Sequence, residues 1–184
     1  MINLRNRGLY SIKDIYHRGL ATPDAIERSG IDLNGNYLKN LKLLPKYVEN
    51  SVLLVDNMLT SLEGCPEVIA LSLHISVNPS LMKLDHVAKK MRDLYIVDCN
   101  IIDVHKLYDC EFTGRFDVIN LSYYKHLAVL PLVKTKNYFV SGNADFDKMF
   151  TEISGISNPT KEDILNAQLV LIANNYITNA RWTP

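Results

Sequence analysis

The chain has 184 residues, of which 47% are hydrophobic and 22% are charged, and its 20 Lys and Arg balance 20 Asp and Glu. A chain of this length and composition can bury a core as one soluble domain. Because no run of like charges appears, the sequence lacks the positive field of a protein that grips a phosphate backbone, and we expect no nucleic-acid partner.

The start of the chain, MINLRNRGLYSIKDIYHRG, has no apolar core long enough for a signal peptide. No later segment runs about 18 apolar residues without interruption, so we expect a cytoplasmic protein with no membrane partner. The three cysteines, Cys65, Cys99 and Cys110, are odd in number and lack CxxC spacing. This argues against a disulfide framework and a zinc site, and it favours reduced thiols.

Residues 1–30 are predicted to form an N-terminal helical cap. The stretch TPDAIERSG has Thr22 in the place of a helix N-cap, Pro23 in the first helical position and Gly30 at the stop. A short helix is therefore expected directly before residue 31, where it would cover one end of the repeats that follow.

Residues 31–147 are predicted to form a solenoid. The spacing apolar-x-apolar-x-x-Asn-x-apolar-x-x-apolar, in which Cys can replace Asn, occurs in three clear copies. Their apolar residues are Ile31, Leu33, Leu38 and Leu41, then Val52, Leu54, Leu59 and Leu62, then Leu94, Ile96, Ile101 and Val104. Asn36 and Asn57 are 21 positions apart, and Asn57 and Cys99 are 42 apart, with Asn78 at the midpoint. This period is typical of leucine-rich repeats.

The other copies are less regular. Around Asn78, Leu73 and Ile75 keep the strand positions, but the later apolar pair shifts to Leu81 and Leu84. Two looser copies are expected after an insertion between Val104 and Phe116, which makes about six coils in all. Their residues are Ile119, Leu121, Leu127 and Leu130 in coil five, and Tyr138, Val140, Asn143 and Phe146 in coil six.

Alternation along each strand explains why such coils should stack. Val52 and Leu54 can point inward while Leu53 and Val55 point outward. One coil cannot bury its inward residues alone, whereas stacked coils cover one another, and the Asn at each turn can pair with backbone groups of the adjacent coil. The predicted fold class is α/β, a short solenoid with a parallel sheet on one face and helical caps. The alternative is an irregular α/β domain with a few similar strands.

Residues 148–184 are predicted to form the C-terminal cap. Thr160 and Asp163 resemble a capping box ahead of an apolar helical stripe, and we expect this helix to seal the last coil. The stripe consists of Ile164, Leu165, Leu169, Ile172 and Tyr176.

Coils one, two and four resemble leucine-rich repeats. The stretch LTSLEGCPEV, residues 59–68, is also similar to a phrase that recurs in small leucine-rich-repeat proteins of tailed phages, where it closes one coil before the next strand. The resemblance covers residues 31 to about 147; coils three, five and six and both terminal segments depart from it. It implies a phage-encoded protein in the cytoplasm of the host cell.

The titratable side chains show no catalytic or metal-binding spacing. The five histidines form neither HxxxH nor HExxH, and no GxSxG, Walker or GxGxxG loop is present. We therefore expect no catalytic residue, no metal and no small-molecule cofactor. His105 and Cys110 could act as base and nucleophile, but their spacing orients no third group, and Cys110 is expected to pack near a coil edge.

The outward strand positions are predicted to form a protein-binding face. A solvated sheet face usually carries polar side chains, whereas coils two and four place apolar or aromatic residues there. The predicted face consists of Leu53, Val55, His74, Tyr95 and Val97, extended by Tyr123 and Phe139. The alternatives are that a cap or the insertion covers these residues, or that the inward and outward assignments are shifted by one residue.

These features predict a non-enzymatic protein–protein interaction module, because aromatic anchors and a neutral total charge suit protein recognition better than phosphate binding. With the phage resemblance, the expected role is to bind and inhibit a host defence or metabolic protein. Binding a second copy through the same face competes as the identity of the partner. The competing function is an effector-type enzyme with repeats as substrate reader and chemistry near Cys110 or in the terminal segments.

Overall fold

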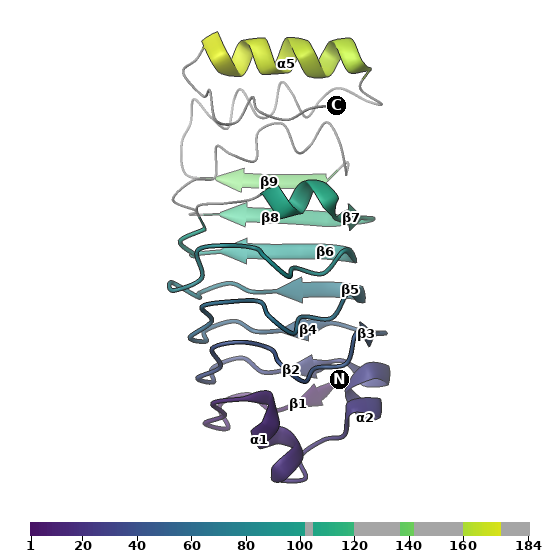
Figure 1. Cartoon of the computed structure of the whole chain (residues 1–184), viewed down its shortest axis with the longest axis vertical. Helices are drawn as coiled ribbons and strands as arrows, with labels where there is room; N and C mark the ends of the chain where they lie inside the picture. The colour runs from purple at the N-terminus through teal and green to yellow at the C-terminus, as the bar shows by residue number, and fades with distance from the viewer. Residues whose placement is uncertain (102–104, 120–136, 142–159, 174–184) are drawn as a thin grey trace.

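The computed structural model describes residues 1–101, 105–119, 137–141 and 160–173. The chain winds into a parallel β-solenoid whose turns stack along one axis, each adding a short strand to a common sheet (Figure 1). In order across the sheet these strands are β1 (Ile2–Asn3), β2 (Ile31–Asp32), β4 (Val52–Leu53), β5 (Val68–His74), β6 (Lys90–Val97), β8 (Arg115–Ile119) and β9 (Asn137–Ser141). Two further strands, β3 (Tyr47–Val48) and β7 (Glu111–Phe112), pair with β5 and β6.

The helices are α1 (Ile12–His17), α2 (Pro23–Ser29), the 3-10 helix η1 (His105–Asp109) and α5 (Lys161–Ala173). Helix α2 is confirmed as predicted, since the Thr22 side chain accepts a hydrogen bond from the Ala25 amide and Gly30 ends the helix at φ 68°. Helix α1 was not predicted, although Ser11 and Asp14 form a capping box at its start. Both helices lie within the first turn and lengthen it, so that Ile2 pairs with Ile31.

Three regular turns of 21 residues form the centre of the molecule. Across the sheet, Ile31 pairs with Val52, Val52 with Leu73 and Leu73 with Leu94. The inward residues two positions further along are all fully buried, namely Leu33, Leu54, Ile75 and Ile96. The predicted alignment of these side chains along one interior is therefore confirmed.

The irregularity predicted for coil three is also confirmed, and the structure shows how it is absorbed. Leu81 and Leu84 are buried despite their shift by one position. In compensation, β6 has one residue fewer than β5 between its inward positions, because Ile69 pairs with Met91 while Leu73 pairs with Leu94. The following turn therefore starts again in register.

The predicted register of coil five is wrong. We expected Ile119 and Leu121 to continue the inward positions, but Phe116 pairs with Leu94 and Ile119 pairs with Val97 in the outward row. The sequence between Val104 and Phe116 suggested a long insertion, whereas the turn from Leu94 to Phe116 is only one residue longer than the regular ones. An error of three positions reverses the alternation, because side chains on a strand have a period of two. In coil six, Tyr138 and Val140 continue the columns of Phe116 and Val118, as predicted.

The sheet also extends into residues 1–30, which contribute β1 as well as two helices. Leu4, Leu9 and Ile12 are buried at the apolar positions of a further copy of the repeat, in which Arg7 stands in the place of Asn. The division of the chain at residues 30 and 147 stays a prediction.

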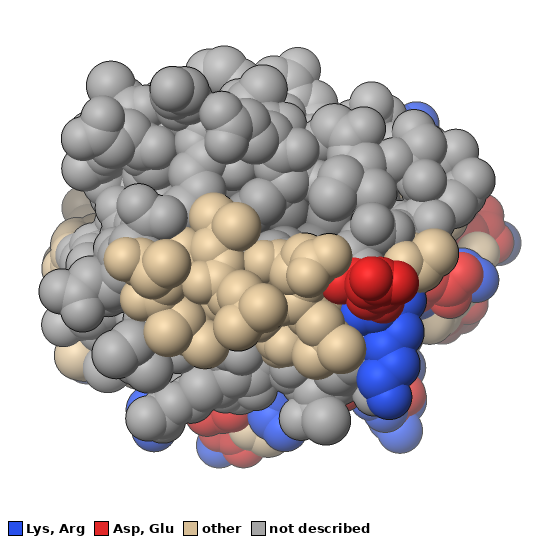
Figure 2. Space-filling model, turned by 90° about the horizontal axis from the view of Figure 1, so that it is seen from above, with Lys and Arg blue, Asp and Glu red and all other residues tan. Residues whose placement is uncertain are grey.

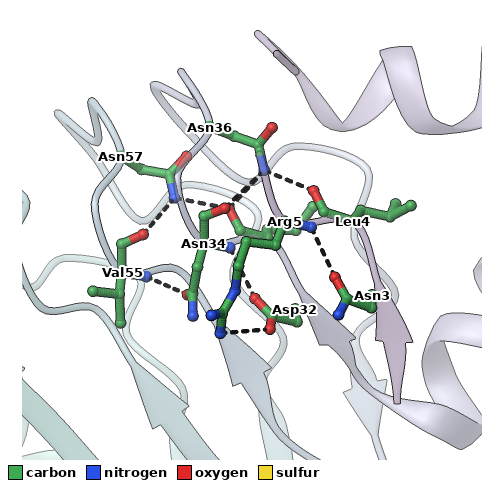
Figure 3. A network of polar contacts seen from close by, with 9 residues as sticks. Asn3, Leu4, Arg5, Asp32, Asn34, Asn36, Val55 and Asn57 are labelled. Atoms are coloured by element: carbon green, nitrogen blue, oxygen red, sulfur yellow. Dashed lines mark hydrogen bonds and ion pairs between the residues drawn. The ribbon is translucent and has the colours of Figure 1, made fainter. Parts of the chain in front are cut away.

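A column of buried asparagines joins successive turns (Figure 3). The Asn57 amide donates to the Leu33 carbonyl of the preceding turn at 3.0 Å, and its oxygen accepts from the Leu38 amide at 3.2 Å. Asn78 repeats this pattern with Leu54 at 2.9 Å and Leu59 at 3.1 Å. Each asparagine thereby pairs backbone groups that burial would otherwise leave without partners.

The two ends of the column differ from its centre. Asn36 accepts from two amides of the first turn, those of Arg7 and Leu9, and donates to the Leu4 carbonyl. At the other end Cys99 takes the asparagine position, and its thiol donates to the Ile75 carbonyl at 3.1 Å. Burial raises the pKa of the Cys99 thiol to about 11, so it stays protonated and keeps this donor.

The residue before each member of the column has a left-handed backbone. These residues are Gly35, Asp56, Val77 and Asp98, with φ between 53° and 66°, and Asn6 has φ 55° at the matching place before Arg7. Glycine, asparagine and aspartate adopt this conformation readily, whereas a β-branched residue such as Val77 does so at a cost. From Gly35 to Asp98 this sharp corner aims the side chain that follows it into the stack, whereas Arg7, which follows Asn6, is exposed.

Helix α5 confirms the predicted C-terminal helix, but three residues of its apolar stripe are largely exposed: Leu165 at 44%, Leu169 at 63% and Ile172 at 48%. In the view onto the end of the molecule where α5 lies, the exposed surface of this helix is mostly uncharged, and its charged residues gather at the helix N-terminus (Figure 2). That this helix seals the last coil stays a prediction, and Tyr176 lies outside the described residues. In the described ranges, no helix is long and apolar enough to cross a membrane.

Substituting Asn78→Asp should destabilise the protein by at least about 3 kcal/mol, measured by urea unfolding. The change removes an amide donor that faces the carbonyls of Leu54, Ile75 and Ser76 and puts a carboxylate against them. Asn40→Asp is the matched control, because the Asn40 side chain accepts from the Lys42 amide, which a carboxylate can also do. Equal losses in the two variants would contradict the role given to the column.

Gly64→Ala should cost at least about 1 kcal/mol more than Gly8→Ala in the same measurement. Both glycines have left-handed backbones, with φ 87° and 62°, so both variants carry that conformational cost. Only at Gly64 would the added carbon lie 2.5 Å from the backbone of the neighbouring turn at Leu41; at Gly8 it meets nothing within 4 Å. Similar losses would show that the turns pack less closely than described.

Candidate functional site

The strand register places one outward residue of each turn in a single row. Its members, in order across the sheet, are Asp32, Leu53, His74, Tyr95, Asp117 and Phe139. Two positions further along the chain in each turn, a second row contains Val55 and Ser76, which follow the ends of β4 and β5, and Val97 and Ile119. The five central residues of the predicted face therefore lie in two adjacent rows on three neighbouring strands.

The outward assignment is correct for these three turns. Leu53, Val55, His74, Tyr95 and Val97 are half-buried, whereas the residues that alternate with them are fully buried. A shift by one residue would have placed them in the core. Of the two predicted extensions, Phe139 on β9 pairs with Asp117 in the register that continues from Tyr95, and Tyr123 lies outside the described residues. The role of all seven residues as a binding face stays a prediction.

His74 and Tyr95 form the aromatic centre of this face. They are direct cross-strand partners, and their rings stack with centroids 4.1 Å apart and planes inclined by 25°. Stacking of this kind fixes the ring positions and stabilises aromatic pairs by about 1 kcal/mol beyond the area they bury. The pair therefore gives the face a preformed aromatic platform, with aliphatic side chains beside it.

One margin of the face is formed by a charged pair at the N-terminal strands (Figure 3). Arg5 Nη2 lies 3.0 Å from Asp32 Oδ2, and the other Asp32 oxygen accepts from the Asn34 amide at 3.0 Å. The Asn34 side chain in turn accepts from the Val55 amide at 2.7 Å. These bonds tie the polar margin directly to the apolar face.

A second charged pair lies at the other margin, on β6. Both Nε and Nη2 of Arg92 lie 2.8 Å from Asp93 Oδ2, which also accepts from the Ser72 hydroxyl at 3.0 Å. Asp93 is two residues before Tyr95 on the same strand. Neither pair was predicted. Arg5 lies two residues after the unpredicted strand β1, and adjacent Arg92 and Asp93 would point to opposite sides of a regular strand.

A second exposed apolar surface, also not predicted, lies at the corners of the turns. Tyr37 and Met58 each directly follow a column asparagine, and both are exposed. Tyr10 stacks on Tyr37 with ring centroids 5.1 Å apart. Tyr37, Met58 and Val77 border a hollow of about 540 Å³. We call this surface the turn edge, and it is distinct from the sheet face.

The candidate base His105 and the candidate nucleophile Cys110 lie at the two ends of η1. Cys110 is buried directly after η1, and its thiol donates to the Lys106 carbonyl at 3.1 Å. His105 starts the same short helix. Cys65 is half-buried against the core, where desolvation raises the pKa of its thiol to about 12, so almost no thiolate forms at neutral pH.

No three His, Cys, Asp or Glu side chains come together to hold a metal ion in the part of the chain that the structure describes. The sheet face thus has a stacked aromatic pair at its centre and an arginine–aspartate pair at each of two margins. Comparison of the chain with models of known protein families, with curated proteins and with solved structures found no match.

Proposed function

We propose that this protein is a non-enzymatic binding module that holds another protein on its sheet face, defined as Leu53, Val55, His74, Tyr95 and Val97. The observation that carries the proposal is the His74–Tyr95 stack, set among aliphatic side chains on the outward side of a parallel sheet. The solvated face of a sheet usually carries polar side chains, whereas aromatic anchors with apolar neighbours are typical of the centres of protein interfaces.

The turns are further proposed to be leucine-rich repeats, with the segments at each end as helical caps. Support comes from the 21-residue period and from the asparagine column, which bonds one turn to the next. Burial of Ile12, Ile15 and Ile26 on α1 and α2 supports the N-terminal cap.

The phrase LTSLEGCPEV supports a phage-encoded protein, but packing also explains four of its ten residues. Leu59, Leu62 and Pro66 are buried, and Gly64 touches the preceding turn. With a phage origin, the proposed role is to bind and inhibit a host defence or metabolic protein in the host cytoplasm. A second copy of the chain is the competing partner, because a self-complementary apolar face would serve equally well.

The double substitution Val55→Asp with Tyr95→Asp should abolish partner binding and leave the melting temperature within a few degrees of wild type, since both side chains keep part of their surface in solvent. Tyr37→Asp with Met58→Asp is the matched control, because it makes the same kind of change on the turn edge. We would measure capture from bacterial lysate for hetero-complexes and sedimentation of the pure protein for self-association.

The outcomes separate the alternatives. Loss of capture or of self-association in the face variant alone supports the proposal and identifies the kind of partner. Loss in the control alone would move the binding surface to the turn edge. An unfolded face variant would show that Val55 and Tyr95 belong to a core, and the proposal would then fail.

A further inference from the structure

We infer that the partner of the sheet face is an acidic protein segment, with carboxylates on either side of an apolar ridge. The inference rests on the proposed function and adds the chemistry of the partner to it. It comes from the two arginines, Arg5 and Arg92, that stand at opposite margins of the face.

In both charged pairs the carboxylate is buried and the guanidinium faces outward. The side chains of Asp32 and Asp93 are each only 8% exposed, whereas those of Arg5 and Arg92 are 53% and 50% exposed. Each pair is neutral in sum, but its positive end lies on the surface. A partner that approaches these margins therefore meets the guanidinium groups rather than the carboxylates.

The aspartates also fix where the arginines stand. The Asp32 carboxylate is held by the Asn34 amide and the Asp93 carboxylate by the Ser72 hydroxyl, so neither is free to turn away. A guanidinium has five N–H donors, of which Arg5 uses one on Asp32 and Arg92 uses two on Asp93. The others can meet carboxylates of a partner, and prior fixing lowers the entropy lost on binding.

The two arginines bracket the apolar residues. Asp32 pairs with Leu53 across the strands, and Asp93 lies two residues before Tyr95. From β1 to β6 the sheet advances by four strand spacings, which is about 19 Å. A helix of about 13 residues covers that length. The matching segment thus has apolar residues in its middle and acidic residues toward both ends.

A nucleic-acid strand fits this surface less well. Between the arginines lie Leu53, Val55 and Val97, which would face a phosphate backbone without any polar contact. The chain as a whole has no net charge, so it lacks the wide positive field that phosphate binding uses.

The test uses a display library of random 16-residue peptides, selected on the wild-type chain and counter-selected on the Val55→Asp, Tyr95→Asp variant. The selected peptides should be net acidic with apolar residues between the acidic ones. Their affinity should fall at least five-fold in Arg5→Gln and in Arg92→Gln and should weaken as salt is raised. Arg28→Gln, an exposed arginine on α2, is the control and should have no effect.

Thermal melting checks that each variant folds. If Arg5→Gln is unstable, Arg5→Lys takes its place; because it keeps the charge, it should retain part of the affinity. Neutral or basic selected peptides, or unchanged affinity in both glutamine variants, would overturn the inference and leave the proposed function standing. Binding of a 20-nucleotide single-stranded DNA that depends on Arg5 and Arg92 would also overturn it. If no peptide depends on the face at all, the proposed function itself fails.

Discussion

The whole structure depends on hydrogen bonds that run from one turn to the next through buried asparagine side chains. Strand pairing joins the turns on the sheet side, and a few direct backbone bonds, such as that from the Leu41 amide to the Glu63 carbonyl, join them elsewhere. At the corner after each strand, further carbonyl and amide groups have no backbone partner. Asn36, Asn57 and Asn78 bond those groups to the turn before, and Cys99 continues the column with a single thiol donor. Since an unpaired buried polar group costs about 1–3 kcal/mol, any chain that closes these corners with another residue must solve the same problem differently.

Register on the outer face follows from this constraint. With an asparagine fixed at the corner and a left-handed residue before it, the regular turns return to the sheet in the same register, and residues 21 apart become neighbours. His74 meets Tyr95 for that reason, and Ser72 meets Asp93. The stacked aromatic pair and the fixed carboxylates are thus products of the same periodicity that builds the core, although none of these residues lies in the core column.

The periodic part of the fold could be predicted from sequence because each turn repeats the same physical requirement. Leu33, Leu54 and Ile96 were identified as one column from spacing alone, and Thr22 and Gly30 marked α2 through its end groups. Strand β1 was missed because Arg7 stands where the repeat pattern has asparagine. Coil five was misplaced because Ile119 and Leu121 fit the apolar spacing and were assigned to the strand after a supposed insertion, whereas the turn is only 22 residues long and Phe116 takes the place expected for Ile119. The two charged pairs could not be predicted from a sequence pattern. Arg92–Asp93 depends on a local irregularity of β6, and Arg5–Asp32 depends on the turn that contains β1, which the spacing did not reveal.

Deleting one complete turn tests the central claim most directly. Removal of residues 53–73 takes out 21 residues and joins Val52 to His74, so that Asn78 moves into the place of Asn57. The shortened protein should unfold cooperatively in urea. Its free energy of unfolding should fall less steeply with urea concentration than that of the full chain, because less surface is exposed on unfolding. Removal of residues 53–72 joins Val52 to Leu73 and turns the inward residues outward, and that protein should not fold. If both deletions fold equally well, or if neither does, the turns are not the interchangeable, register-bound units described here.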